Sequence, residues 1–177
     1  MRINIIGHGS GWEEGLDAEG AKWMINYFHH KADVLFEIHP ESHPYHDKLA
    51  HERANAELVG TPVITHKDYP FELVSRFYGT DYFGSSTDWL IAHAIRQLEF
   101  MSQHPVMEIH LYGVSMDDKG DHYEKRCCTD FWCGVAIGRG IKVVVHGNST
   151  VMTTSDGKTY GLFTPMARHY EPHNDAH

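Results

Sequence analysis

The sequence lacks a long apolar run, and this absence excludes one class of protein. No stretch of the 177 residues approaches the roughly 20 consecutive apolar residues that a membrane-spanning helix needs. Hydrophobic residues still make up 41% of the chain, a fraction that is typical of a globular protein with a buried core. We therefore expect a soluble protein with no membrane partner.

Clustered basic residues are lacking as well. The formal net charge is −9, with 15 Lys and Arg against 24 Asp and Glu, and the basic residues form no long run. Proteins that bind duplex nucleic acid neutralise its phosphates with clustered Lys and Arg. We therefore expect no duplex nucleic acid among the partners.

Cysteine is scarce and unevenly placed. The three cysteines are Cys127, Cys128 and Cys133, an odd number that includes an adjacent pair. The first residues lead straight into an apolar segment and lack the pattern of a signal peptide. These features predict reduced thiols on a buried helix face. They also predict a cytoplasmic location.

Neither an internal repeat nor a convincing linker divides the chain. We predict one α/β domain over residues 1–168 and a polar tail over residues 169–177. Helical patterns cover residues 17–28, 46–58 and 129–139, and another helix begins at Ser85 or Ser86. Residues 69–84 are predicted to be irregular with one helical turn. The predicted strands span residues 3–6, 32–38, 61–65, 107–112 and 141–145.

The alternation of strands and helices predicts the fold class. Such chains form a mostly parallel sheet covered by helices on both faces, with right-handed crossovers. The expected fold is a Rossmann-like three-layer sandwich whose five-stranded sheet has the order 3-2-1-4-5.

Ligands of such sheets bind beyond the carboxyl ends of the strands, where the strand order reverses. The loop Gly7-His8-Gly9-Ser10-Gly11 follows the first predicted strand, and residues 113–116 follow the fourth. Glycines let backbone amides approach a phosphate, and the helix start at Ser85 and Ser86 suits an anion. Two alternatives stay open, because the glycines also suit a tight turn and the serines a plain helix cap.

Histidine is abundant, with 16 in the chain. Three of them, His39, His43 and His46, lie with Glu41 in an eight-residue segment that could bind zinc. The spacing matches no standard zinc pattern and its prolines favour an extended loop, so we expect a loop lining the crevice, with no metal and no cofactor. Imidazole titrates near neutral pH, which makes His8 and His39 the candidate acid–base residues.

Several motifs together carry a resemblance to known proteins. They are Ile38-His39-Pro40, the helix start Tyr82-Phe83-Gly84-Ser85-Ser86, the strand end Leu111-Tyr112-Gly113-Val114, and residues 138–143. Over residues 3–145 the chain resembles small phage-encoded proteins of unknown function. It also resembles the nucleotide-binding core of bacterial CMP-sialic-acid-dependent sialyltransferases and motility-accessory-factor-like domains.

The resemblance implies a set of ligand contacts. His8 and His39 stand where the family has asparagines, and Ser115 stands where it has an aspartate. Asn26 is similar to a family asparagine that follows the first helix, and the helix start would hold the nucleotide phosphate. The implied nucleotide-binding residues are Gly7, Gly9, Ser10, Gly11, Asn26, Ser85, Ser86, Gly113, Ser115 and Tyr123.

One departure from the family limits what the resemblance implies. The sialyltransferases carry their catalytic histidine on a lid segment, whereas here Tyr123 leads almost directly into the last helix. We therefore expect a domain that binds a nucleotide or nucleotide sugar, which could be a glycosyl- or nucleotidyl-group transferase or hydrolase with a reduced lid.

Two other functions stay open. The protein could sequester a nucleotide signal without turnover, or it could be a virion or host-interaction protein with a vestigial crevice. The aromatic residues between 69 and 83 could roof a base pocket or form the interface of a homodimer, the commonest symmetric assembly.

Overall fold

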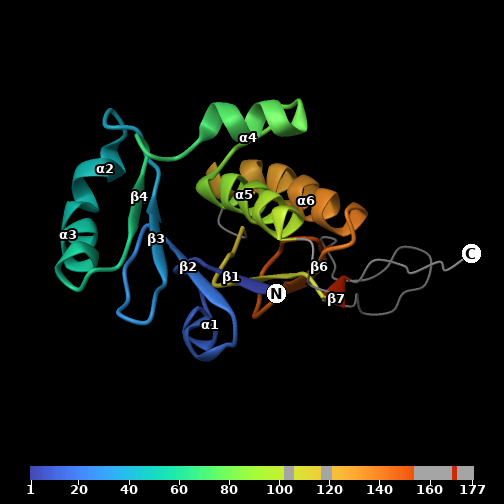
Figure 1. The fold of residues 1–177 in the computed structure, drawn as a ribbon, viewed down its shortest axis with the longest axis horizontal. Coiled ribbons are helices and arrows are strands. Elements are labelled where there is room, and N and C mark those ends of the chain that lie inside the picture. Colours follow the sequence, from blue (N-terminus) through green and yellow to red (C-terminus); the bar gives the residue numbers. More distant parts are fainter. Residues whose placement is uncertain (102–105, 117–120, 154–168, 171–177) are drawn as a thin grey trace, which may run out of the picture.

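The computed structural model describes residues 1–101, 106–116, 121–153 and 169–170, and its centre is a seven-stranded sheet (Figure 1). The spatial order of the strands is β4-β3-β2-β1-β5-β6-β7. The pairs from β4 to β6 are parallel, and β7 is antiparallel to β6. The strands are β1 (Arg2–Ile6), β2 (Ala21–Ile25), β3 (Val34–Glu37), β4 (Val63–Thr65), β5 (Glu108–Tyr112), β6 (Lys142–Val145) and β7 (His169–Tyr170).

The mostly parallel α/β sheet confirms the predicted class, but the predicted helix over residues 17–28 is wrong. Residues 21–25 of that segment form β2, which is inserted between β1 and β3, and the helix before it, α1, spans only Glu13–Asp17. Trp23, Met24 and Ile25 are consecutively buried, as in a strand covered on both faces. A short apolar run fits either element, so periodicity could not separate them. The five predicted strands keep their relative order around this insertion.

The other helices are α2 (Pro44–Lys48), α3 (Ala50–Leu58), α4 (Phe71–Tyr78), α5 (Ser86–Phe100) and α6 (Asp121–Gly138). The predicted helix over residues 46–58 is divided at Leu49, and α6 begins earlier than expected. The irregular region predicted for residues 69–84 is wrong, because it contains the eight-residue helix α4. This helix presents Phe71, Val74 and Tyr78 to the core at helical spacing, and Gly79 ends it with a φ of +66°.

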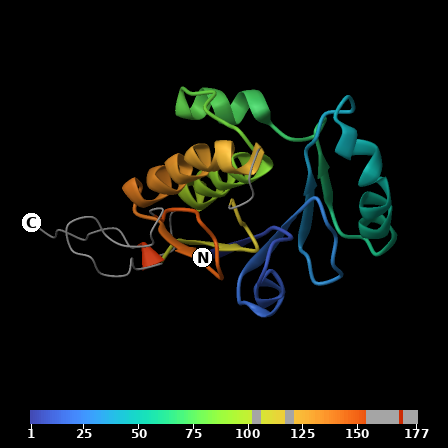
Figure 2. The ribbon, with the colours of Figure 1, turned by 180° about the vertical axis from the view of Figure 1, so that it is seen from behind.

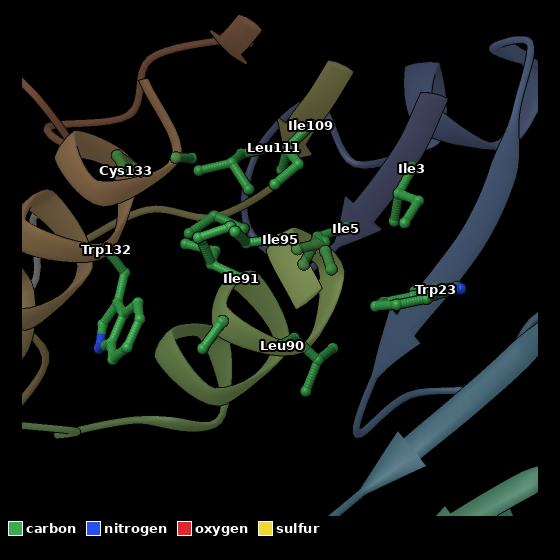
Figure 3. Close-up of a cluster of buried hydrophobic side chains, with 14 of the residues drawn as sticks. Ile3, Ile5, Trp23, Leu90, Ile91, Ile95, Ile109, Leu111, Trp132 and Cys133 are labelled. Carbon is green, nitrogen blue, oxygen red and sulfur yellow. The ribbon is translucent and has the colours of Figure 1, made fainter. Parts of the chain in front are cut away.

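Helices cover the two faces of the sheet unequally. In Figures 1 and 2, α4, α5 and α6 lie on one side and α1 on the other. The larger core lies under α5 and α6, where Ile91 and Ile95 of α5 meet Ile5 of β1 and Trp132 closes the far end (Figure 3). A smaller cluster under α1 includes Ile6 and Tyr112.

The cysteines lie on α6 and are free thiols. Cys128 and Cys133 are buried as predicted, but Cys127 is exposed, because neighbouring positions on a helix point in different directions. In the part of the chain that the structure describes, no helix is both long and apolar enough to cross a membrane. The first two residues of the expected tail form β7, and the remainder, 171–177, lies outside the described residues.

Candidate functional site

The sheet reverses its direction of growth between β1 and β5. The chain places β1 to β4 in succession toward one edge and then returns to place β5 on the other side of β1. Beyond the carboxyl ends of the strands at this point lies a cavity of about 400 Å³. The residues that line it are Gly7, His8, Gly9, Ile25, Asn26, Tyr27, His39, Tyr45, Leu49, Thr87, Gly113, Val114, Ser115 and Met116, and we call it the first cavity.

The glycines of the first cavity allow two loops to come into contact, the one that follows β1 (the β1 loop) and the one that follows β5 (the β5 loop). The Gly7 amide donates to the carbonyl of Tyr112 and the Gly9 amide to that of Gly113, each at 2.8 Å. A Cβ on Gly7 would lie 2.5 Å from the Gly113 oxygen, and one on Gly9 would lie 2.5 Å from Oγ of Ser115. Close packing between the loops therefore requires these glycines, and their amides already have partners inside the protein. The contacts support the tight-turn alternative for Gly7 and Gly9.

The other residues of the glycine-rich loop do not line the first cavity. Ser10 lines a separate small cavity of about 50 Å³ together with Ser115 and His146. Gly11 has a φ of +81°, and a Cβ there would approach Gly147 of the loop after β6. The loop therefore spans from the first cavity toward β6.

Asn26 occupies an unusual position in the cavity wall. It follows the strand β2 rather than a helix, and it has a φ of +65°, which residues other than glycine rarely adopt. Its backbone N–H donates to the carbonyl of Phe36 at 2.9 Å. Its side-chain Oδ1 is buried and has no hydrogen-bond partner among the described residues. Backbone strain and an unsatisfied polar atom both cost free energy, and such features gather at functional sites.

Aromatic rings that sequence reasoning missed surround the cavity. Tyr27 stacks on His8 with ring centroids 4.3 Å apart, and Tyr45 lies 5.8 Å from His39. The two tyrosines are 38% and 51% exposed although they line the cavity. Exposed ring faces suit a flat heteroaromatic base. Tyr27 follows the end of β2 by two residues, so correct assignment of that strand would have identified it.

A buried ionic network holds His39. Glu37, the last residue of β3, is fully buried, and its Oε1 lies 2.8 Å from Nδ1 of His39. Its Oε2 accepts a hydrogen bond of 2.6 Å from Arg53 of α3. Burial lowers the pKa of His39, and the Glu37 carboxylate opposes that shift in part. His39 is therefore a neutral imidazole near pH 7 and can accept a proton.

Glu37 and Arg53 were also missed by sequence reasoning. The available signal was a carboxylate at the end of an apolar segment, two residues before the His-Pro pair. The partner Arg53 lies 16 residues away on another element, and no local pattern indicates that pairing.

A second cavity of about 340 Å³ adjoins the first, and His39 lines both. Ser85 and Ser86 belong to this second cavity, so the structure places them beside the first cavity rather than in it. Phe71 and Phe83 also line it, which supports the idea that the aromatic region roofs a pocket. The remaining lining residues are Ile38, Pro40, His43, His66, Gly84, Trp89 and Lys125.

The start of α5 is a capping box, which confirms the helix-cap alternative. Asp88 Oδ2 accepts hydrogen bonds from the amides of Gly84 and Ser85, each at 2.8 Å, and Ser85 Oγ accepts from the Asp88 amide. Thr129 of α6 donates to Oδ1 of Asp88 at 2.5 Å. Burial raises the pKa of Asp88, and these hydrogen bonds oppose the shift. The protein's own carboxylate therefore occupies the first turn, where a phosphate was expected.

Part of the histidine-rich segment lines the cavities, as His39 and His43 show, but the expected extended loop ends at His43, because Pro44–Lys48 form α2 and His46 lines neither cavity. His39 stacks on His43 with centroids 4.6 Å apart, and Nδ1 of His46 lies 3.6 Å from Glu37. The residues described by the structure contain no group of three or more His, Cys, Asp and Glu that could hold a metal ion. Tyr123 lies in the first turn of α6, and the expectation for its side chain falls outside the described residues.

Comparison with known proteins adds no relative. A scan against family models, a search of curated proteins and a search of solved structures each found no match for the chain. The resemblance to the sialyltransferase core therefore stays a prediction.

Proposed function

We propose that the first cavity binds a nucleotide or nucleotide sugar. The observation that carries the proposal is Asn26, which lines the cavity where the strand order reverses, has a left-handed backbone, and has a buried side-chain Oδ1 without a partner among the described residues. An amide side chain suits the donors and acceptors on the edge of a base. The neighbouring Tyr27 offers a ring face on which the base would stack.

The same site supports proton transfer to or from the ligand. His39 is a half-buried imidazole whose pKa is lowered by burial, and it lines the cavity together with His8 of the loop after β1. These groups fit a glycosyl- or nucleotidyl-group transferase or a hydrolase, in which a hydroxyl or water loses a proton as it attacks.

Binding without turnover is the second candidate, and one observation favours it. None of the described residues that line the first cavity is Lys or Arg, so no permanently cationic side chain there would stabilise a departing phosphate. A protein that sequesters a nucleotide signal needs no such stabilisation.

Calorimetry against nucleosides, nucleotides and nucleotide sugars tests the proposal. The informative variant is Asn26→Gly, because glycine adopts the same backbone conformation without strain and removes only the amide side chain. We expect its affinity to fall about fivefold or more, since one hydrogen bond contributes about 1 kcal/mol. Met152→Gly, at the other left-handed non-glycine position among the residues that the structure describes, is the matched control and should bind normally.

Two results would contradict the proposal. One is a panel in which no compound binds, and the other is Asn26→Gly binding as tightly as the wild type. Mass spectrometry after long incubation separates the two candidates, because a transferase or hydrolase yields product and a sequestering protein returns its ligand unchanged.

A further inference from the structure

We infer that Glu37 is a positioning residue, which with Arg53 fixes His39 for proton transfer at the boundary between the two cavities. A carboxylate at this position is costly, because Glu37 is fully buried in a sheet whose neighbouring side chains, Leu35 and Phe36, are buried and apolar. The core itself would accept an apolar residue there. The Glu37 carboxylate is hydrogen-bonded to His39 and Arg53, and these bonds indicate that it positions His39.

The hydrogen bonds of Glu37 select one tautomer of His39. Oε1 accepts from the His39 backbone amide at 3.2 Å and lies 2.8 Å from Nδ1 of its ring. An ionised carboxylate can only accept, so Nδ1 must carry the proton. In the neutral ring the lone pair is then on Nε2, the nitrogen that is left for a ligand.

Arg53 supplies the positive charge that a buried carboxylate requires. Its Nη1 donates to Oε2 of Glu37 at 2.6 Å and to the carbonyl of His46 at 2.8 Å. The guanidinium therefore links α3 to both β3 and α2. Removal of Arg53 would leave the fully buried Glu37 carboxylate without its cationic partner, which is strongly destabilising.

The position of His39 gives this network a function. His39 lines both cavities, and Glu37 holds its ring through Nδ1. Nε2 is therefore the ring nitrogen that can hydrogen-bond a hydroxyl or water bound between the cavities. The unprotonated Nε2 accepts a proton from that group, and the Glu37 carboxylate stabilises the resulting imidazolium. The proton then passes to a leaving oxygen or to bulk water. The nature of the ligand rests on the proposed function, but the positioning of His39 does not.

A similar trio at the amino-terminal end of the parallel strands, the end opposite to that of Glu37, provides a matched control. Glu108 of β5 pairs with Arg2 at 2.7 Å and lies 3.4 Å from Nε2 of His110. None of these three residues lines the first or the second cavity. Glu108→Gln therefore removes a comparable charge without touching His39.

Nitrogen-15 NMR of the histidine rings tests the inference without any ligand. We expect wild-type His39 to carry its proton on Nδ1, and Glu37→Gln to lower its measured pKa by about one, because the stabilising charge is lost. The double variant Glu37→Gln with Arg53→Met guards against misfolding, since it removes both charges, and it should lower the pKa as well. Glu108→Gln should leave the titration of His39 unchanged.

Two NMR results would overturn the inference: a proton on Nε2 in the wild type, or the same His39 titration in folded Glu37→Gln. If product forms from a panel compound, Glu37→Gln should lower kcat about tenfold or more, shift its pH profile and leave KM nearly unchanged. A panel without binding contradicts the proposed function alone, since the NMR titration still decides the role of Glu37.

Discussion

The amide of Gly9 donates a hydrogen bond of 2.8 Å to the carbonyl oxygen of Gly113, and this bond joins the β1 loop to the β5 loop across the switch point. The two loops approach so closely that a Cβ on Gly113 would lie 2.6 Å from Cβ of Trp12. The wall of the first cavity is therefore a packed backbone surface, and its shape depends on residues without side chains.

The first prediction concerns this loop contact. Gly9→Ala should lower the free energy of unfolding by about 1–3 kcal/mol, because the new methyl group meets Oγ of Ser115 and the Gly113 carbonyl. Urea denaturation measures the change. Gly134→Ala is the control, because that helical glycine has open space around it and should gain about 0.5–1 kcal/mol. Equal stability of Gly9→Ala and the wild type would contradict the packing described above.

The second prediction concerns the buried cap of α5. Thr129→Val removes the hydroxyl that donates to Asp88 and keeps the shape of the side chain, so it should cost about 1–3 kcal/mol of stability. The half-buried Thr65 makes an equivalent but solvent-exposed hydrogen bond to Asp68 at 2.6 Å. Thr65→Val should therefore cost less, since water can replace the lost donor. Thermal unfolding of the two variants side by side tests this, and equal losses would show that burial is not the cause.

The third prediction concerns the stacking platform. Tyr27→Leu should weaken the binding of any nucleotide found in the panel by about tenfold, because stacking on an aromatic ring contributes about 1–3 kcal/mol per base. Tyr82→Leu removes a similarly exposed tyrosine that lines neither cavity, and its affinity should match the wild type. Calorimetry gives both values, and an equal loss in the two variants would point to a general effect on the fold.

The fourth prediction concerns stability in acid. Burial, together with the nearby charge of Arg2, lowers the pKa of His110 to about 4, below its usual 6.5. The unfolded chain binds this proton first as the pH falls, so His110 contributes stability that is present above pH 6.5 and is lost between 6.5 and about 4. We expect a loss of about 1–3 kcal/mol over that range.

Denaturation as a function of pH measures this loss, and His110→Gln should flatten the curve between these two pH values. The comparison must allow for His146, whose Nε2 lies 3.0 Å from Nδ1 of His110. A slope that does not change in the variant would assign the acid sensitivity to other groups.

Local features of the fold could be predicted from the sequence. The start of α5 is one, because Ser85 and Asp88 are three residues apart and satisfy each other's backbone amides within a single turn. The meeting of the β1 and β5 loops is another, since strands that alternate with helices bring the loops at the switch point together whatever the details of the chain. The boundaries of such elements depend on interactions within a few residues.

Tertiary structure alone decided the rest. Whether residues 21–25 form a strand depended on the place between β1 and β3, where both faces of Trp23 and Met24 are covered. Arg53 can pair with Glu37 only because α3 packs against β3, and the strained Asn26 exists only because β2 ends at the cavity. The sequence by itself determined the alternation of elements and the loops that could form a site. Long-range packing determined which of their side chains are buried, paired and aimed at a ligand, because burial and charge pairing depend on neighbours that are distant along the chain.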